Sequence, residues 1–473
     1  MHSQVVVLGG GPGGYAAAFL AADAGFDVAI VDQESRLGGT CLLRGCIPSK
    51  ALLHATQLAS EATDELGEWG FEFKSPEIDV DTLRSRKEKV LKNLTGGLAQ
   101  IAKKRKVRHI VARGTFASST SLKLTGGDES TYDDDTLEYD RCILAAGSVP
   151  TVPKPWQVDS PRVMDSSGAL DLADIPETLL VIGGGYIGLE MGTVYARLGS
   201  KVTVIELLAG LLPGADRDLV KPLHRRLGKQ FEEIRLETKV TSIEPGEKDV
   251  TVGWENADGS GEDVFSRVLI SVGRTPNTAN LGLDNTKVQL DDGGFVQADH
   301  FQRTDDDAIL AIGDLAGEPM LAHKASAEAK IAVASLQDHD EPFEPRAIPA
   351  VVFTDPEIAW AGLTETQAAD EGIDVETASY PWAASGRAQA LGRTEGLTKI
   401  LFEPDSDRVL GVGLVGAGAG ELISEAALAM EMGAVAHDIA ETIHPHPTLS
   451  ETITFAAELH LGSAVELYKP KKK

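Results

Sequence analysis

Hydrophobic residues occur along the chain in short runs that end at glycines or at turn-forming residues. Such uninterrupted apolar runs are typical of parallel strands that are covered on both faces. They predict strands at 4–8, 28–32, 142–146, 178–182, 202–206, 268–270 and 308–312. Between them, apolar residues recur at helical spacing, which predicts helices at 16–24, 51–62, 81–106 and 190–198. The alternation predicts an α/β fold built on parallel sheets.

The pattern changes at about residue 347. Alternating β-type residues at 350–353 and 398–402 flank glycine turns, and 421–432 has the apolar spacing of a helix. We expect a separate α+β domain from this point on. Earlier in the chain, Pro150, Pro153 and Pro155 predict a linker.

One supersecondary unit occurs twice. A strand, a glycine turn, a helix and a second strand that ends in an acid run from Gln4 to Asp32, and the same order recurs from Thr178 to Glu206, each position 174 residues later. The glycines fall at Gly9, Gly11 and Gly14 in the first unit and at Gly183, Gly185 and Gly188 in the second. The repeat predicts two copies of one nucleotide-binding unit.

The glycine spacing is that of a dinucleotide-binding loop. The first glycine of G-x-G-x-x-G makes the tight turn, the second lets the backbone approach a pyrophosphate, and the third lets helix and strand pack closely. The acids Asp32 and Glu206 fall where a ribose hydroxyl would find a carboxylate. Two copies therefore predict two dinucleotides. Because Glu206 repels a 2′-phosphate, the second site is expected to prefer NAD over NADP.

Composition narrows the class of protein. The chain has 473 residues, and its 72 acids against 44 basic residues give a net charge of −28. Such a charge repels nucleic acid and anionic membranes, so we expect neither as a partner. The N-terminus runs straight into a short strand with no signal peptide, which indicates a cytoplasmic protein. A solvated surface accounts for the acids, and adaptation to a high-salt cytoplasm is the alternative hypothesis.

Cys41 and Cys46 are the two closely spaced cysteines among the three in the chain. A regular helix would separate their Cα atoms by about 7.5 Å along its axis, which is more than a disulfide spans. The backbone is therefore expected to leave the regular helix between them, with Gly45 and Pro48 allowing the break. A redox pair is the favoured interpretation. A metal site would need two more ligands, and a buried inert pair is the other alternative.

A stiff loop near the C-terminus carries two histidines, His444 and His446, between prolines. A histidine oriented by a carboxylate is a usable base near neutral pH. His446 with Glu451 is one candidate pair. A histidine held only by packing is the alternative, and this motif alone does not decide between them.

Together these segments resemble the flavin disulfide reductases, over essentially the whole chain. The resemblance lies in Gly38-Gly39-Thr40-Cys41-(x4)-Cys46-Ile47-Pro48-Ser49-Lys50 and in His444-Pro445-His446-Pro447-Thr448-Leu449-Ser450-Glu451. Asp32 stands where the family usually has Glu, and Pro445 where Ala is common. Within the family, the chain is most similar to members that oxidise dihydrolipoamide carried on the lipoyl domain of a 2-oxoacid dehydrogenase acyltransferase.

The resemblance implies FAD at the first glycine loop, NAD at the second, and a homodimer. It implies that Cys41, Cys46, His446 and Glu451 are catalytic, with His446 and Glu451 acting on the cysteines of the other subunit. Because the cysteine pair lacks two further ligands, no metal is expected. The residues implied for FAD are Gly9, Gly11, Gly14, Asp32, Thr40, Lys50, Gly114, Gly147, Asp314 and Ala322. Those implied for NAD are Gly183, Gly185, Gly188, Glu206, Val240 and Gly273. Lys50 is expected near the flavin N5, with Glu190 as its partner.

The implied domains are an FAD-binding domain at 1–150, an NAD-binding domain at 151–275, a central domain at 276–346 and an interface domain at 347–473. Related functions remain open at this point. Glutathione reductase-like proteins would show basic residues near Glu206, and mercuric reductase-like proteins would show extra cysteines near the C-terminus, where this chain has none. A non-enzymatic flavoprotein scaffold would have lost the catalytic residues.

Overall fold

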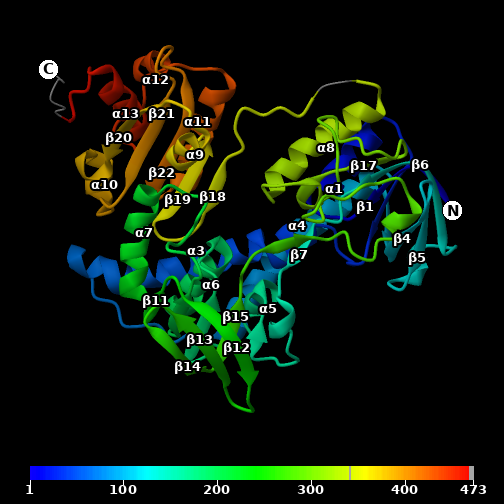
Figure 1. Ribbon diagram of the computed structural model, residues 1–473, viewed down its shortest axis with the longest axis horizontal. Helices are drawn as coiled ribbons and strands as arrows, with labels where there is room; N and C mark the ends of the chain where they lie inside the picture. Colours follow the sequence, from blue (N-terminus) through cyan, green and yellow to red (C-terminus); the bar gives the residue numbers. More distant parts are fainter. Residues whose placement is uncertain (340–341, 468–473) are drawn as a thin grey trace.

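The structure is a computed structural model and describes residues 1–339 and 342–467. Three groups of elements are separated in space (Figure 1): one sheet with the N-terminus, one with the middle of the chain, and one with the C-terminal region.

The first sheet is built around the predicted strand at the N-terminus. β1 (His2–Leu8) pairs in parallel with β2 (Val28–Asp32) on one side and with β6 (Thr136–Leu144) on the other. β3 (Arg108–Val111) extends the sheet beyond β2, and β4 (Arg113–Ser118) and β5 (Ser121–Thr125) extend it beyond β6. Helix α1 (Pro12–Asp23) connects β1 to β2. The helix begins at Pro12, earlier than the predicted 16, because a proline at the first helical position has no N–H that a partner must satisfy.

A later segment of the chain completes this sheet. β17 (Ile309–Ala311) pairs in parallel with β6, and α8 (Ala322–Leu336) packs against α1. Figure 1 shows α8 beside α1 at the end of the molecule that holds the N-terminus. Residues between Leu281 and Val333 therefore share a core with the first region, although the domain boundaries themselves stay a prediction.

The second sheet repeats the plan of the first. β9 (Thr178–Ile182) pairs in parallel with β10 (Lys201–Ile205) and with β15 (Arg267–Ile270), and α6 (Tyr186–Arg197) connects β9 to β10. The outer strands are β8 (Val163–Met164) and β11 (Glu233–Arg235), and an antiparallel ribbon of β12 (Lys239–Pro245), β13 (Val250–Asn256) and β14 (Gly259–Phe265) is added.

The chain crosses between the two sheets twice, and the crossings pair with each other. β7 (Ser148–Pro150) is antiparallel to β16 (Arg274–Pro276). The linker predicted from Pro150, Pro153 and Pro155 therefore begins with a short strand, in which Val149 pairs with Thr275.

Two long helices continue from the first sheet toward the other regions. α3 (Cys46–Ser60) begins at the second cysteine, and α4 (Val80–Lys104) follows the π-helical turn Glu61–Glu65 and a short 3-10 helix. Both match the predicted helical patterns, with α3 starting earlier than the predicted 51.

The C-terminal region is a five-stranded antiparallel sheet in the order β18-β19-β22-β21-β20. Its strands are β18 (Ala350–Val352), β19 (Glu357–Gly362), β20 (Glu376–Pro381), β21 (Leu397–Phe402) and β22 (Val409–Gly416). Its longest helices are α11 (Ala419–Glu431) and α13 (Glu451–Leu461). This is the predicted α+β arrangement.

A buried lysine ties this region to the second sheet. Lys399 Nζ lies 2.7 Å from Asp216, 2.8 Å from Asp218 and 2.7 Å from Glu365. Asp216 and Asp218 stand at the start of α7 (Arg217–Gln230), and Glu365 starts α9 (Glu365–Glu371). The carboxylate oxygens of this group lie within 4.8 Å of one another, and the lysine ammonium supplies the positive charge among them.

Within residues 1–339 and 342–467, no helix combines the length and the apolar composition that crossing a membrane requires.

Candidate active site

The two glycine loops have the same geometry. Gly9 and Gly183 have φ angles of +113° and +107°, which favour glycine. A Cβ on Gly14 would meet the carbonyl oxygen of Gly9 at 1.9 Å, and one on Gly188 would meet that of Gly183 at 2.3 Å. Each third glycine therefore lets a helix lie directly against its loop, as the spacing predicted.

The second glycine of each loop faces open space. A Cβ on Gly11 would have nothing nearer than 3.9 Å, and one on Gly185 would have nothing within 4 Å. Both glycines cap the N-terminus of a helix, α1 or α6, without a side-chain cap. Free backbone N–H groups and the positive end of the helix dipole suit a pyrophosphate at both places.

The acid after each second strand holds its glycine loop. Asp32 Oδ2 accepts a hydrogen bond from the Gly10 N–H at 2.5 Å, and Glu206 Oε2 accepts one from the Gly184 N–H at 2.6 Å. A carboxylate has about four lone-pair positions, so each acid can still accept a ribose hydroxyl.

A cavity of about 670 Å³ opens beside the first loop. The residues implied for FAD that line it are Gly9, Gly11, Asp32, Thr40, Lys50, Gly147, Asp314 and Ala322. Both cysteines of the predicted redox pair also line it. The backbone of the glycine loop, the Asp32 carboxylate and the two cysteines therefore line one cavity, whose size suits a dinucleotide.

The other residues implied for cofactors lie outside this cavity lining. Gly114 is on β4, where a Cβ would meet Leu8 at 2.8 Å, and Gly14 packs beneath the loop. Val240 is buried on β12, and Gly273 has a φ of +125°. Their contacts with a cofactor stay predictions.

The helix breaks between the two cysteines, as predicted. α2 (Gly39–Arg44) ends at Gly45, and α3 begins at Cys46. A Cβ on Gly45 would meet the carbonyl oxygen of Thr40 at 2.9 Å, so a larger residue would not fit this turn. Pro48 lies within the first turn of α3, where its missing N–H costs nothing.

The cysteines are free thiols in this structure, and their ionisation is unequal. The hydrogen bond with Cys41, assisted by the charge of Lys50, lowers the pKa of Cys46 to about 7. The same contact with Cys46 and burial raise the pKa of Cys41. Cys46 therefore carries the thiolate of the reduced pair near neutral pH.

Lys50 has the partner that the sequence predicted. Its Nζ lies 2.8 Å from Oε2 and 3.0 Å from Oε1 of Glu190, a carboxylate on α6. The helix that follows Cys46 is thereby joined to the helix that follows the second glycine loop.

His446 and Glu451 form the predicted pair. His446 Nδ1 lies 2.8 Å from Oε1 of Glu451, and Oε2 accepts the Thr448 N–H at 2.7 Å. Because Nδ1–H is donated to the carboxylate, Nε2 keeps the lone pair that can accept a proton. The His446 side chain is 78% exposed and does not line the cavity of the cysteines. One chain alone thus leaves this base facing outward.

The sequence pattern indicated no role for His444, whose side chain is only 6% exposed. Its Nε2 lies 2.6 Å from Glu425 on α11, and its Nδ1 lies 2.6 Å from the Thr454 hydroxyl on α13. His444 therefore ties the loop of His446 to two helices. Its place next to His446 in the motif was the available signal, but both partners are distant in the sequence.

Ser148 and Arg274 were also missed. The Ser148 hydroxyl donates to Asp314 Oδ2 at 2.5 Å and lies 2.7 Å from Arg274 Nε. Both residues line the cavity. They belong to β7 and β16, whose pairing no local pattern revealed.

Comparisons with known proteins identify the family of the chain. The family model of the pyridine nucleotide-disulphide oxidoreductases matches residues 3–329, and the model of that family's dimerisation domain matches residues 348–457. The chain therefore belongs to the pyridine nucleotide-disulphide oxidoreductase family and is an FAD-dependent oxidoreductase. The resemblance inferred from the motifs and the α/β fold class are both confirmed, and the dimerisation domain supports the homodimer.

Similar proteins are found among curated sequences and solved structures. The chain is 44% identical to dihydrolipoyl dehydrogenases of Vibrio cholerae and Haemophilus influenzae, with 100% of this chain and 98% of each relative covered. It is 27% identical to LpdA from Mycobacterium tuberculosis, at a TM-score of 0.88, with 97% and 99% of the two chains covered. A copper(II) complex of the flavoprotein disulfide reductase RclA from Escherichia coli shares 28% identity at a TM-score of 0.85, with the same coverage.

Proposed function

We propose that the protein is a dihydrolipoyl dehydrogenase, the E3 component of a 2-oxoacid dehydrogenase complex. It oxidises dihydrolipoamide on the lipoyl domain of an acyltransferase and reduces NAD⁺ to NADH. The observation that carries the proposal is that Cys41 and Cys46 line the same cavity as the first dinucleotide loop. The curated relatives of that name, similar over their whole length, support it.

The cofactors fit the two loops. Gly9, Gly11, Asp32 and the other cavity-lining residues would hold FAD, and Gly183, Gly185 and Glu206 would hold NAD. When bound, FAD carries electron pairs from the cysteines to NAD⁺.

The cysteine chemistry follows from the unequal thiols. In the oxidised protein, His446 of the partner subunit takes a proton from one substrate thiol through Nε2. The thiolate attacks Cys41 Sγ, the Cys41–Cys46 disulfide breaks, and Cys46 leaves as a thiolate, which its lowered pKa favours. The second substrate thiol then attacks the substrate sulfur bonded to Cys41, the mixed disulfide breaks, and Cys41 leaves and takes up that thiol's proton, while the partner's His446 keeps the first proton. The substrate becomes a disulfide, and both electrons remain on the cysteine pair.

Glu451 acts through His446. It accepts the Nδ1–H, holds the imidazole in the orientation that exposes Nε2, and stabilises the imidazolium after proton transfer. Its position at the start of α13 favours a carboxylate, because the helix N-terminus is positive.

Turnover of free dihydrolipoamide with NAD⁺, compared with NADP⁺ and with glutathione disulfide plus NADPH, tests the proposal. We expect activity with dihydrolipoamide and NAD⁺. Activity with only glutathione disulfide, or a flavin spectrum that dithiols do not change, would contradict it. The cytoplasmic location and the high-salt adaptation remain predictions.

A further inference from the structure

Phe353, from the C-terminal region, contacts both members of the Lys50–Glu190 pair. Its backbone N–H donates to Glu190 Oε1 at 3.0 Å. Its ring centroid lies 4.5 Å from Lys50 Nζ, within the range of a cation–π contact. Phe353 directly follows β18, so the C-terminal sheet reaches the pair that adjoins the redox cysteines.

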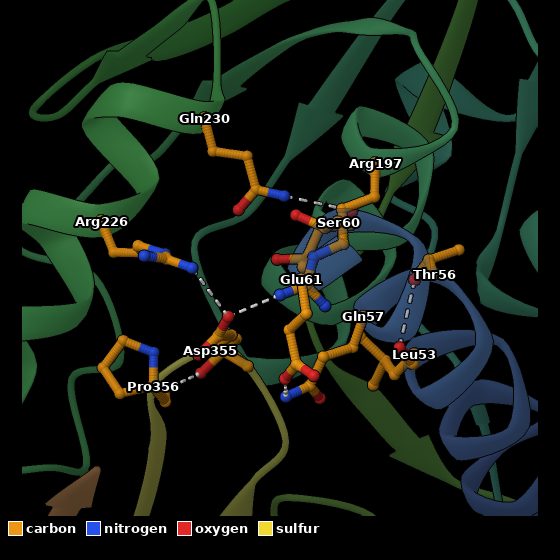
Figure 2. A network of polar contacts seen from close by, with 12 residues as sticks. Leu53, Thr56, Gln57, Ser60, Glu61, Arg197, Arg226, Gln230, Asp355 and Pro356 are labelled. Atoms are coloured by element: carbon orange, nitrogen blue, oxygen red, sulfur yellow. Dashed lines mark hydrogen bonds and ion pairs between the residues drawn. The ribbon is translucent and has the colours of Figure 1, made fainter. Parts of the chain in front are cut away.

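Two residues further on, Asp355 is fixed by three arginines. Arg197 and Arg226 lie 2.7 Å and 3.2 Å from its Oδ2, and Arg393 pairs with Oδ1. Asp355 is only 5% exposed. Burial opposes its ionisation, but Arg393, Arg226 and Arg197 outweigh burial and lower the pKa of Asp355. Figure 2 shows Asp355 between Arg226 and Arg197, with Pro356 beside it.

Phe353 and Asp355 both contact α6, and Asp355 also pairs with Arg226 on α7. α6 carries Glu190 and, at its last residue, Arg197. α3 carries Lys50 and continues into the turn that begins at Glu61. The charge of Glu61 acts on Arg197. Figure 2 shows the end of α3 next to Arg197 and Asp355. A displacement of the backbone at Asp355 would therefore also displace Phe353.

We propose that Phe353 is a positioning residue that holds the Lys50 ammonium in place for Cys46, and that Asp355 anchors Phe353. The inference rests on the proposed function, because it concerns the thiolate of the same cysteine pair. The negative face of the ring and the Glu190 carboxylate hold the ammonium from two sides. Through Phe353, the C-terminal region thus sets the environment of the redox centre.

Placement matters because opposite charges act on Cys46. Lys50 stabilises the Cys46 thiolate, whereas Glu190 destabilises it. Among the described residues of one chain, the groups whose charges act on or with Cys46 are Cys41, Lys50, Glu190, Tyr15 and Tyr186, and in the proposed dimer His446 of the partner subunit joins them. Without the Phe353 ring to confine it, Lys50 stabilises the Cys46 thiolate less, and the destabilising charge of Glu190 has the larger effect. The thiolate of Cys46 is then harder to form.

The test uses the FAD-loaded protein reduced by two electrons with dithionite, so that no dithiol substrate is involved. The long-wavelength absorbance of the Cys46 thiolate next to the flavin is recorded against pH. Phe353→Leu removes the ring but keeps the backbone N–H. We expect the pH at which half of the long-wavelength absorbance has appeared, the midpoint, to rise by about half a pH unit in this variant. Phe353→Tyr keeps the ring and should restore the original midpoint.

Phe301→Leu is the matched control, because Phe301 has its own cation–π contact, 4.9 Å from Arg303, away from the cavity. It should not move the midpoint. An unchanged midpoint in a folded Phe353→Leu protein would overturn the proposal for Phe353. If the unsubstituted protein shows no long-wavelength band at any pH, the proposed function itself fails.

The anchor is tested by Asp355→Asn, which should move the midpoint in the same direction as Phe353→Leu. Because this change leaves buried arginines without their carboxylate, Arg226→Gln is the second variant. It removes only the most exposed of the three partners, whose side chain is 35% exposed, and should give a smaller shift of the same sign. An unshifted midpoint in folded Arg226→Gln protein, with Asp355→Asn unshifted or unfolded, would overturn the role of Asp355.

Discussion

Lys50 Nζ lies 2.8 Å from Glu190 Oε2, although 140 residues separate them in the sequence. The Glu190 side chain is 4% exposed, so its buried charge is balanced by the lysine. This pair joins the helix of the redox cysteine to the helix of the second nucleotide loop. The cysteine pair thus lies where the two nucleotide-binding regions meet.

Cys41→Ser and Cys46→Ser are expected to differ. Cys41→Ser keeps Cys46, and the serine hydroxyl can still donate to its thiolate, so the long-wavelength band should persist while dithiol turnover is lost. Cys46→Ser should lose the band. Absorbance spectra of the two FAD-loaded variants check this, and the opposite spectra would show that the roles of the two sulfurs are exchanged.

Glu206 is expected to set the choice between NAD⁺ and NADP⁺. Glu206→Ala removes the charge that repels a 2′-phosphate and should lower the ratio of kcat/KM for NAD⁺ to that for NADP⁺. Glu206→Asp is the matched control, since it keeps a carboxylate. A ratio that stays the same in Glu206→Ala would remove this residue from the ribose site.

The sequence was sufficient for those features that depend on local patterns. The glycine loops predicted the turns at Gly9 and Gly183, because the positive φ angles and the nearby backbone of Ala145 and Ser271 admit no Cβ there. The spacing of Cys41 and Cys46 predicted a break in the helix, and the break occurs at Gly45.

Features that depend on distant pairing were not predicted. β17 joins the first sheet beside β6, which is why residues between Leu281 and Val333 share that core. The partners of His444 and Phe353 lie on other elements, and no periodicity in the sequence identifies them. His446 was assigned by resemblance, and within one chain it faces outward.

Lys399→Met is expected to destabilise the protein by about 3 kcal/mol, because it leaves the carboxylates around a buried ammonium unpaired. Urea unfolding measures this. Lys239→Met is the matched control, since Lys239 pairs with Glu255 on the surface and should cost less than about 1 kcal/mol.

The loss of unfolding free energy caused by Lys399→Met should depend on pH. Burial opposes the ionisation of Asp216, but the hydrogen bond from Lys399 and those from Glu365 and Thr366 outweigh it and lower its pKa. This stabilisation is present above the ordinary pKa of an aspartate and is lost as the pH falls through the lowered value. The difference between Lys399→Met and the unsubstituted protein should therefore shrink in acid. Equal costs of Lys399→Met and Lys239→Met at neutral pH would contradict this account.

The net charge of −28 predicts that salt stabilises the fold. Screening by KCl reduces repulsion among the acids, so the Tm should rise from low to multimolar KCl. Thermal melts over that range check this. A Tm that does not rise would rule out the adaptation to high salt.

The exposed position of His446 leads to a prediction about the dimer. His446→Gln should leave folding and FAD binding intact, because the side chain is 78% exposed. It should lower dithiol oxidation by roughly 10²–10⁴-fold, the scale of a lost general base. His446→Asn is a second variant that also removes the base, and it should show the same loss of dithiol oxidation with folding and FAD binding intact.

We propose that each active site combines cysteines of one subunit with the histidine of the other. Inactive Cys41→Ser and inactive His446→Gln chains are dissociated, mixed and reassembled, with heterodimers confirmed by mass. Each heterodimer then has one site with both lesions and one site with neither, so about half of the activity of an unsubstituted dimer should return. Confirmed heterodimers that remain inactive would contradict the shared site and leave His446 serving its own chain or none.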